Sequence, residues 1–219
     1  MSLIPLLQSW LVGWILVCLF MWRIGFFLMF LIFTIWFLFG VVGYAGFNLY
    51  HQGAGFWLFI ISEVMIFGTL FFYARGFETA SVGLEPISSF YGIPLVCCFL
   101  LLGSSITATA FHHGLGLGGS EIYLFCTICL GACFVGAQLY EFHLCEFCWS
   151  DNAFYSVCFC IVGLHFSHVL VGLFGFCMFL KLQRSVVSYL QLFYANVLVW
   201  YWHFVDYIWL LVYMVVYLR

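Results

Sequence analysis

Long apolar runs, separated by short polar segments, make up almost the whole chain of 219 residues. Each run has about the twenty apolar residues that a helix needs to cross the hydrocarbon core of a bilayer. The pattern predicts seven transmembrane helices, over residues 3–22, 24–47, 56–73, 93–110, 122–140, 153–180 and 190–217. The expected fold is therefore an all-α integral membrane protein in which residues 1–219 form a single seven-helix domain.

The last apolar run carries two ionisable residues near its middle, His203 and Asp206. A spacing of three residues places both on one face of a helix. Such groups are costly against lipid, so that face must be turned toward protein, and an ionisable residue at this depth is by default a candidate functional residue.

Other apolar runs contain polar residues of the same kind. The full set of candidate intramembrane polar residues is Glu63, Gln138, Glu141, His165, His168, His203 and Asp206, with His112 and His113 near one end of a span. His165 and His168 also share a helix face. The stretch GSSITATAF, residues 103–111, is small and hydroxylated, and it is expected to face protein because serine and threonine bridge neighbouring membrane helices.

Polar segments are expected to connect the helices. The segment NLYHQGAG separates the second span from the third, and residues 75–91 form an exposed loop. A glycine-rich turn follows His112 and His113, and a solvated loop with His143, Glu146 and Asp151 follows Glu141.

The composition changes the class of protein that is possible. Hydrophobic residues make up 67% of the chain, charged residues only 6%, and the mean hydropathy is +1.21. Soluble domains are roughly 45–50% apolar and about 25% charged, so the chain belongs with multi-span membrane proteins. Nucleic acid is not expected as a partner. The apolar run that begins at Leu3 lacks the basic leader of a removable signal peptide.

The eleven cysteines include a spacing that is typical of zinc sites, C-x2-C-x15-C-x2-C at Cys126, Cys129, Cys145 and Cys148. If residues 122–140 form one helix, with a rise of 1.5 Å per residue, Cys126 and Cys145 lie about 28 Å apart. They cannot share an ion at that distance, so no metal is expected here.

Three interpretations of these polar residues remain open: a metal or haem site, a carrier, and a structural helix bundle. A haem or di-iron site needs histidines facing one another or Glu-x-x-His pairs, and no such pair lies within a span. The seven histidines also lack the HxxxH and HxxHH patterns of membrane histidine-box enzymes. A carrier would be expected to show broken helices in matching halves. The third interpretation is a helix bundle whose polar groups pair internally, and which binds lipid and braces a larger membrane enzyme.

Five stretches in the same order resemble the subunit III family of haem-copper oxidases, most closely its mitochondrial cytochrome c oxidase members. They are FIISEVMIF, IPLVCCFLLLGSSITATAFHH, AQLYEF, SDNAFYSVCFCIVGLHFSHVLVG and WYWHFVDYIWLLVY, within residues 56–217. By this resemblance, Glu63 matches the buried glutamate of the family's third helix, and His203 and Asp206 match its last-helix motif.

The resemblance implies a fold in which helices 1–2 are separated from helices 3–7 by a V-shaped cleft filled with phospholipid. It implies a chain with no catalytic residue, haem, copper or other metal of its own. Such a chain packs chiefly on subunit I, which carries the oxygen-reducing centre, and supports proton uptake while cytochrome c is oxidised and protons are pumped. A quinol oxidase subunit III would share these features, and a stand-alone membrane carrier or redox enzyme is the alternative of a different class.

The front of the chain departs from the family. NLYHQGAG, with His51, stands where members have a longer histidine-bearing segment that contacts lipid headgroups. Lys181 and Arg184 are therefore the expected phosphate partners, with His51 as a further candidate. The expected location is the mitochondrial inner membrane, with a bacterial plasma membrane as the alternative.

Overall fold

The structure is a computed structural model, and it describes residue 32 and residues 49–80, 88–116, 119–182 and 189–218. The chain forms two compact units, Met1–Gln52 and Gly53–Arg219. The predicted spans 3–22 and 24–47 lie outside the described residues, apart from residue 32, and nearly all of the described residues belong to the second unit.

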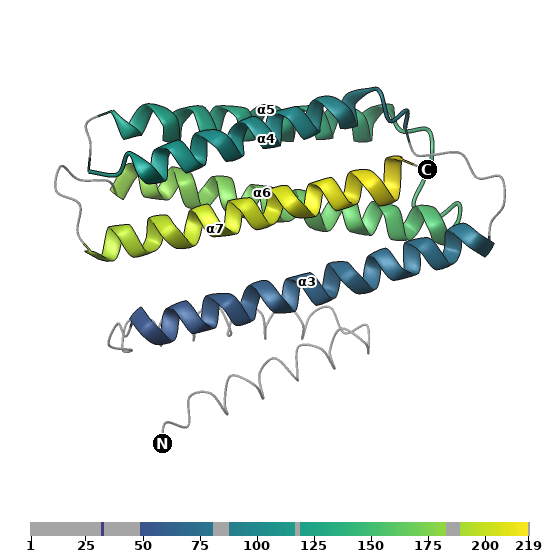
Figure 1. The fold of residues 1–219 in the computed structure, drawn as a ribbon. Helices are drawn as coiled ribbons and strands as arrows, with labels where there is room; N and C mark the ends of the chain where they lie inside the picture. The colour runs from purple at the N-terminus through teal and green to yellow at the C-terminus, as the bar shows by residue number, and fades with distance from the viewer. Residues whose placement is uncertain (1–31, 33–48, 81–87, 117–118, 183–188, 219) are drawn as a thin grey trace, which may run out of the picture. The chain divides into compact units, whose positions relative to one another are not determined.

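Five helices long and apolar enough to cross a membrane follow one another along the described part of the chain. They are α3 (Leu49–Ala80), α4 (Ile93–His113), α5 (Ser120–Leu144), α6 (Ala153–Leu182) and α7 (Tyr189–Val212), and a short π-helix, η1 (Tyr213–Tyr217), continues α7. Successive helices run in opposite directions (Figure 1). The last five of the seven predicted spans are thus confirmed as helices.

Three of the expected connections were drawn too long, and the third is the loop after Glu141, because α5 continues to Leu144 and includes His143. The segment NLYHQGAG is helical from Leu49 onward, so His51 belongs to α3, and α3 also continues through Arg75 to Ala80. Neither helical extension, residues 49–55 or residues 75–80, contains a proline, and the ends of a helix that projects beyond the hydrocarbon core are satisfied by water. The described remainder of the second connection, residues 88–92, consists of bends and turns.

Local sequence explains where α4 begins and ends. Pro94 lies in its first turn, where a missing N–H removes no intrahelical hydrogen bond. Gly114 ends the helix, and its N–H donates to the carbonyl oxygen of Ala110 at 3.0 Å. The turn that follows uses Gly116 and Gly119 at φ values of 88° and 101°, which favour glycine. The predicted glycine-rich turn is thus confirmed at its described residues.

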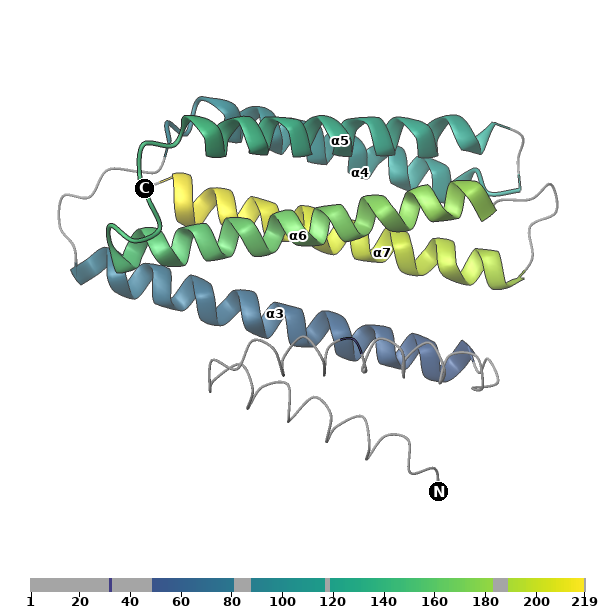
Figure 2. The same cartoon turned by 180° about the vertical axis from the view of Figure 1, so that it is seen from behind.

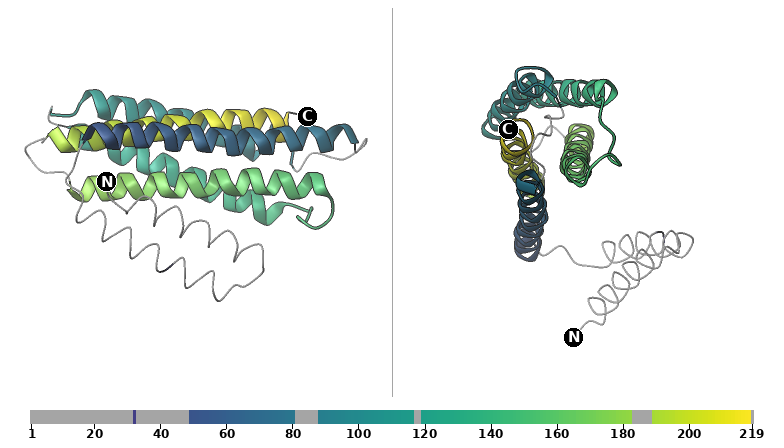
Figure 3. Two further views of the ribbon diagram at one scale, coloured as in Figure 1. Left: turned by 90° about the horizontal axis from the view of Figure 1, so that it is seen from below. Right: turned by 90° about the vertical axis from the view of Figure 1, so that its right-hand side faces the viewer.

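Helices α4, α5, α6 and α7 pack as a four-membered bundle in which each contacts two neighbours. Viewed end-on, in the right-hand panel of Figure 3, α4 and α5 form one layer and α7 and α6 the other. Helix α3 flanks the layer of α6 and α7, as Figure 2 shows from behind. In the most apolar 18-residue stretch of each helix, 56% of the residues are buried in the last span, Tyr189–Tyr217, against 6% in α3. The core of the described unit therefore lies around α7.

The side chain of Trp202 on α7 is the centre of this core. It is fully buried, and its Nε1–H donates to Ser104 Oγ on α4 at 2.9 Å. Gly172 on α6 and Gly131 on α5 lie against the indole, and a Cβ at Gly172 would come within 2.7 Å of Trp202 Cζ3. The two glycines thus create the space in which the largest side chain of α7 fits between three helices.

Candidate functional site

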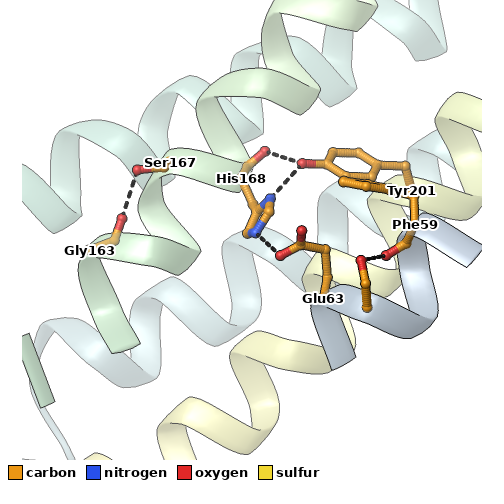
Figure 4. Close-up of polar contacts among 7 residues, drawn as sticks. Phe59, Glu63, Gly163, Ser167, His168 and Tyr201 are labelled. Carbon is orange, nitrogen blue, oxygen red and sulfur yellow. Dashed lines mark hydrogen bonds and ion pairs between the residues drawn. The ribbon is translucent and has the colours of Figure 1, made fainter. Parts of the chain in front are cut away.

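The polar residues expected inside the membrane form three separate contacts between helices, and the first joins α3 to α6 and α7. Glu63 Oε2 lies 3.2 Å from His168 Nε2, with the two side chains 15% and 13% exposed. His168 Nδ1 lies 3.0 Å from the hydroxyl of Tyr201, as Figure 4 shows. Phe67, on the same face of α3 as Glu63, packs on the His168 ring at a centroid distance of 5.6 Å.

Hydrogen-bond directions limit where protons can lie in this contact. The Tyr201 hydroxyl donates to the backbone carbonyl of His168 at 3.1 Å, so its oxygen is left to accept from Nδ1–H. His168 Nε2 is then the ring nitrogen that faces the Glu63 carboxylate. Glu63 and His168 thus lie together at a depth where an unpaired charge would be costly.

The second contact joins α7 to α4 through His203 and Asp206. Ser105 Oγ lies 2.8 Å from His203 Nδ1, and Thr109 Oγ1 lies 3.2 Å from His203 Nε2. Because the Thr109 hydroxyl donates to the Ser105 carbonyl at 3.0 Å, it accepts from Nε2–H, and Ser105 Oγ–H then donates to Nδ1. Asp206, one turn further along the same face of α7, is 4% exposed and thus also points into the protein. The prediction that both residues face a neighbouring helix is confirmed.

The third contact lies at the end of α5. Glu141 is 3% exposed, Ser88 Oγ donates to its Oε1 at 2.7 Å, and Gln138 Nε2 donates to its Oε2 at 2.9 Å. Tyr217, in the π-helix, lies close to Glu141. This contact ties the start of α4, the end of α5 and the end of α7 together.

His165 lies apart from these three contacts, although it shares a helix with His168. It is 1% exposed, and its Nε2–H donates to the carbonyl oxygen of Val205 at 3.1 Å. Its ring packs against Trp209 at a centroid distance of 5.0 Å. His165 thus points into the α6–α7 interface, while His168 reaches Glu63 on α3.

The remaining candidates lie at helix ends or outside the description. Lys181 is exposed in the last turn of α6. Arg184 and the side chain of His51 lie outside the described residues. At the end of α4, His112 Nε2 is hydrogen-bonded to Asn196 Oδ1 of α7. His143, Glu146 and Asp151 are exposed, as predicted, but His143 lies in the last turn of α5 and not in the loop that was expected there.

The partners of the polar set include residues that the sequence analysis did not name. They are Ser88, Ser105, Thr109 and Tyr201. The hydroxylated stretch of α4 was expected to face protein, and the buried Ser104 and Ser105 confirm this. Ser88 and Tyr201 gave no such signal, because Ser88 belongs to a segment expected to be an exposed loop and Tyr201 lies among apolar residues.

A protein-bound metal ion generally needs three or four suitable side chains close together. Within the described ranges, no three His, Cys, Asp or Glu side chains come together in a way that would hold an ion. Cys126 lies near the start of α5, and Cys145 caps the C-terminal end of the same helix. The cysteines of the zinc-like spacing therefore do not meet at one location.

Known proteins similar to this chain share one description. The model of the family described as "Cytochrome c oxidase subunit III" matches residues 14–219. A protein named cytochrome c oxidase subunit 3 from Bacillus subtilis (strain 168) is 34% identical over 176 residues, which cover 75% of this chain and 84% of that protein. Proteins of the same name from Patiria pectinifera and Aedes aegypti are 36% and 35% identical over 170 and 175 residues, which cover 71% and 73% of this chain. The matched part spans about two thirds of those two relatives' own length, 65% and 66%.

Proposed function

Because the chain belongs to the cytochrome c oxidase subunit III family, we propose that it is a non-redox subunit of that oxidase. In this role it braces the catalytic subunit, subunit I, binds phospholipid and supports proton uptake while oxygen is reduced and protons are pumped. Haem and copper belong to the partner subunits in this proposal. The name of the relatives, cytochrome c oxidase subunit 3, favours cytochrome c over a quinol as the electron donor.

The observation that carries the proposal is that two intramembrane histidines, His168 and His203, face groups of this chain with both ring nitrogens. Both ring nitrogens of His203 have a hydroxyl partner, and those of His168 face Tyr201 and Glu63. A ring nitrogen needs a free lone pair to ligate iron or copper. These residues therefore favour a role in joining helices over a role in holding a redox centre.

The outer surface of the bundle supports a role inside a larger assembly. Large apolar side chains are exposed along α3, among them Leu58 at 68%, Met65 at 65% and Phe72 at 78%. Lipid or a neighbouring subunit must cover such a surface in the membrane. A bracing subunit would use part of it against subunit I and leave the rest to lipid.

A substitution at Glu63 tests the non-redox role. We expect Glu63→Ala to leave haem content and initial electron transfer of the purified oxidase nearly unchanged, because Glu63 contacts only His168 among charged groups of the described residues. Assembly or the duration of activity should decrease, because α3 loses its ion pair. Absorption spectra, oxygen consumption over time and a native gel measure these three properties. Glu146→Ala, which removes an exposed carboxylate, is the matched control. Loss of haem from a fully assembled complex would contradict the proposal.

The proposed phospholipid contact involves Lys181 and Arg184, with His51 as a further candidate. Lys181 is exposed at the end of α6, where a cation can reach lipid phosphates. We expect Lys181→Ala combined with Arg184→Ala to reduce the anionic phospholipid that co-purifies with the complex, measured by mass spectrometry. An unchanged lipid content would exclude these two residues as phosphate partners.

We further propose that the chain lies in the mitochondrial inner membrane as a multi-pass subunit. Its matches to relatives from Patiria pectinifera, Schizophyllum commune and Aedes aegypti support this location, alongside the match to a bacterial relative. Fractionation of cells with antibodies against the chain tests it. Recovery with the plasma membrane rather than with mitochondria would contradict it.

A further inference from the structure

A cavity of about 190 Å³ lies where the start of α4 meets the end of α5. On the α4 side it is lined by Ser88, Ser89, Gly92 and Pro94, and on the α5 side by Glu141 and Cys145. The start of α4, the end of α5 and the C-terminus gather at the same end of the bundle (Figure 1). None of the eight lining residues is aromatic or basic.

The carboxylate of Glu141 gives this cavity its chemical character. Its hydrogen-bond donors Ser88 and Gln138 are uncharged, as is the neighbouring Tyr217. A carboxylate offers about four lone-pair positions, so at least one remains for a further donor. A buried carboxylate without a charged partner is costly, and a cation in the cavity would remove that cost.

The position of the cavity indicates where the cation comes from. Ile93 is the first residue of one transmembrane segment and Leu144 is the last residue of another, and both also line the cavity. The cavity therefore lies at the level of the lipid headgroups. The two helix ends that meet there have opposite polarity: the C-terminal end of α5 favours a cation and the N-terminal end of α4 favours a phosphate.

Size and lining limit the kind of cation. An apolar protein cavity of about 150 Å³ admits benzene, so 190 Å³ accommodates a small polyatomic group rather than a bare ion alone. A primary ammonium offers three N–H donors, which suit Glu141 and the hydroxyl oxygens of Ser88 and Ser89. A quaternary ammonium has no N–H donor and is typically held by aromatic faces, which this cavity lacks.

We propose that this cavity binds the primary ammonium headgroup of an ethanolamine phospholipid, with Glu141 as the charge partner. The inference rests on the proposed phospholipid-binding role and extends it, because it names a headgroup class and a site distinct from Lys181 and Arg184. Ser88 joins the lipid site to the first turn of α4, so the bound headgroup also stabilises the contact between α4 and α5.

Competition between two lipids tests the proposal on the purified oxidase complex. The complex is equilibrated with equal amounts of phosphatidylethanolamine and phosphatidylcholine, washed, and its retained lipids are counted by mass spectrometry. We expect the wild type to prefer phosphatidylethanolamine. Glu141→Gln removes the charge and Cys145→Met fills the cavity, and each should weaken retention of phosphatidylethanolamine by about 10- to 100-fold, the loss expected for one charge-assisted hydrogen bond.

Two control variants share the same end of the bundle. Glu146→Gln and Cys148→Met change exposed residues that do not line the cavity, and both should behave as the wild type. If Glu141→Gln fails to assemble, the wild-type preference and the Cys145→Met variant decide the question.

Equal retention of both lipids by the wild type would overturn the proposal, as would unchanged retention in both Glu141→Gln and Cys145→Met. A parallel sample with free ethanolamine separates the two sources of ammonium. Uptake of free ethanolamine that depends on Glu141, without a lipid preference, would assign the site to a soluble amine and overturn the lipid assignment. Failure of the chain to co-purify with an oxidase would instead contradict the proposed function, so the two failures are distinguishable.

Discussion

Replacing Gly172 with alanine tests whether the fit of Trp202 between the helices stabilises the bundle. The new Cβ would lie 2.7 Å from Trp202 Cζ3 and 2.8 Å from Cε3. Carbon atoms in contact prefer a separation of about 3.5 Å or more, so the overlap is roughly 0.8 Å. The indole cannot move away freely, because its Nε1–H is bound to Ser104 and Gly131 lies against the ring, with its Cβ position 3.2 Å from Cη2.

The expected cost follows from this overlap. Overpacking of a well-filled core costs about 1–3 kcal/mol, while alanine in place of glycine in a helix gains up to about 1 kcal/mol. Gly163→Ala on the same helix is the matched control, because a Cβ there meets no atom within 4 Å. The difference between the two variants isolates the steric cost.

The assay is the temperature at which this chain dissociates from the purified complex, followed on native gels. A steric cost of 2 kcal/mol corresponds to a midpoint about 4–8 °C lower for Gly172→Ala than for Gly163→Ala, using the scale for a chain of this length. Trp202→Phe should lower the midpoint less in the Gly172→Ala background than in the wild type, because the smaller ring relieves the overlap with the new Cβ. Equal midpoints for the two alanine variants would refute this account of the core.

Three further predictions concern the polar contacts and the loop after α5. Glu63→Gln and His168→Gln should destabilise the complex by similar amounts, and the double variant by no more than either single one, because both remove the same ion pair; additive midpoint shifts would contradict this. Ser105→Ala should cost about 1–3 kcal/mol in unfolding free energy, because the Nδ1 atom of His203 loses its hydrogen-bond donor, and a midpoint equal to that of the wild type would count against it. Burial raises the pKa of the Cys145 thiol, so a smaller fraction of it is thiolate at neutral pH. Alkylation should therefore be slower at Cys145 than at the exposed Cys148, and the difference between the two rates should become smaller as the pH rises. Equal alkylation rates at pH 7 would contradict this prediction.

Much of the fold follows from the apolar pattern, because membrane spans are defined by length and composition. Their ends follow less well. α3 continues for several residues beyond the predicted 56–73 at both ends, since polar residues in water do not stop a helix unless a proline or a favourable cap is present.

The candidate site was predictable as a set of residues and unpredictable as a set of contacts. Spacing alone showed that His203 and Asp206 share a face, because that is a property of one helix. It did not show that Ser105 lies opposite His203, or that Glu63 meets His168, because those pairs depend on the order of helices around the bundle. The spacing of His165 and His168 also left open that their rings have different partners.

The place of Trp202 in the bundle has a consequence for biogenesis. Its side chain touches residues of three earlier helices, α4, α5 and α6, while it belongs to the last of the described helices to be synthesised. Until α7 enters the bilayer, Ser105 and Thr109 lack the imidazole that they bind in the finished subunit. A nascent chain that stops before α7 would therefore expose partly polar helix faces to insertion factors and quality-control proteases. These faces would be covered once α7 has been inserted.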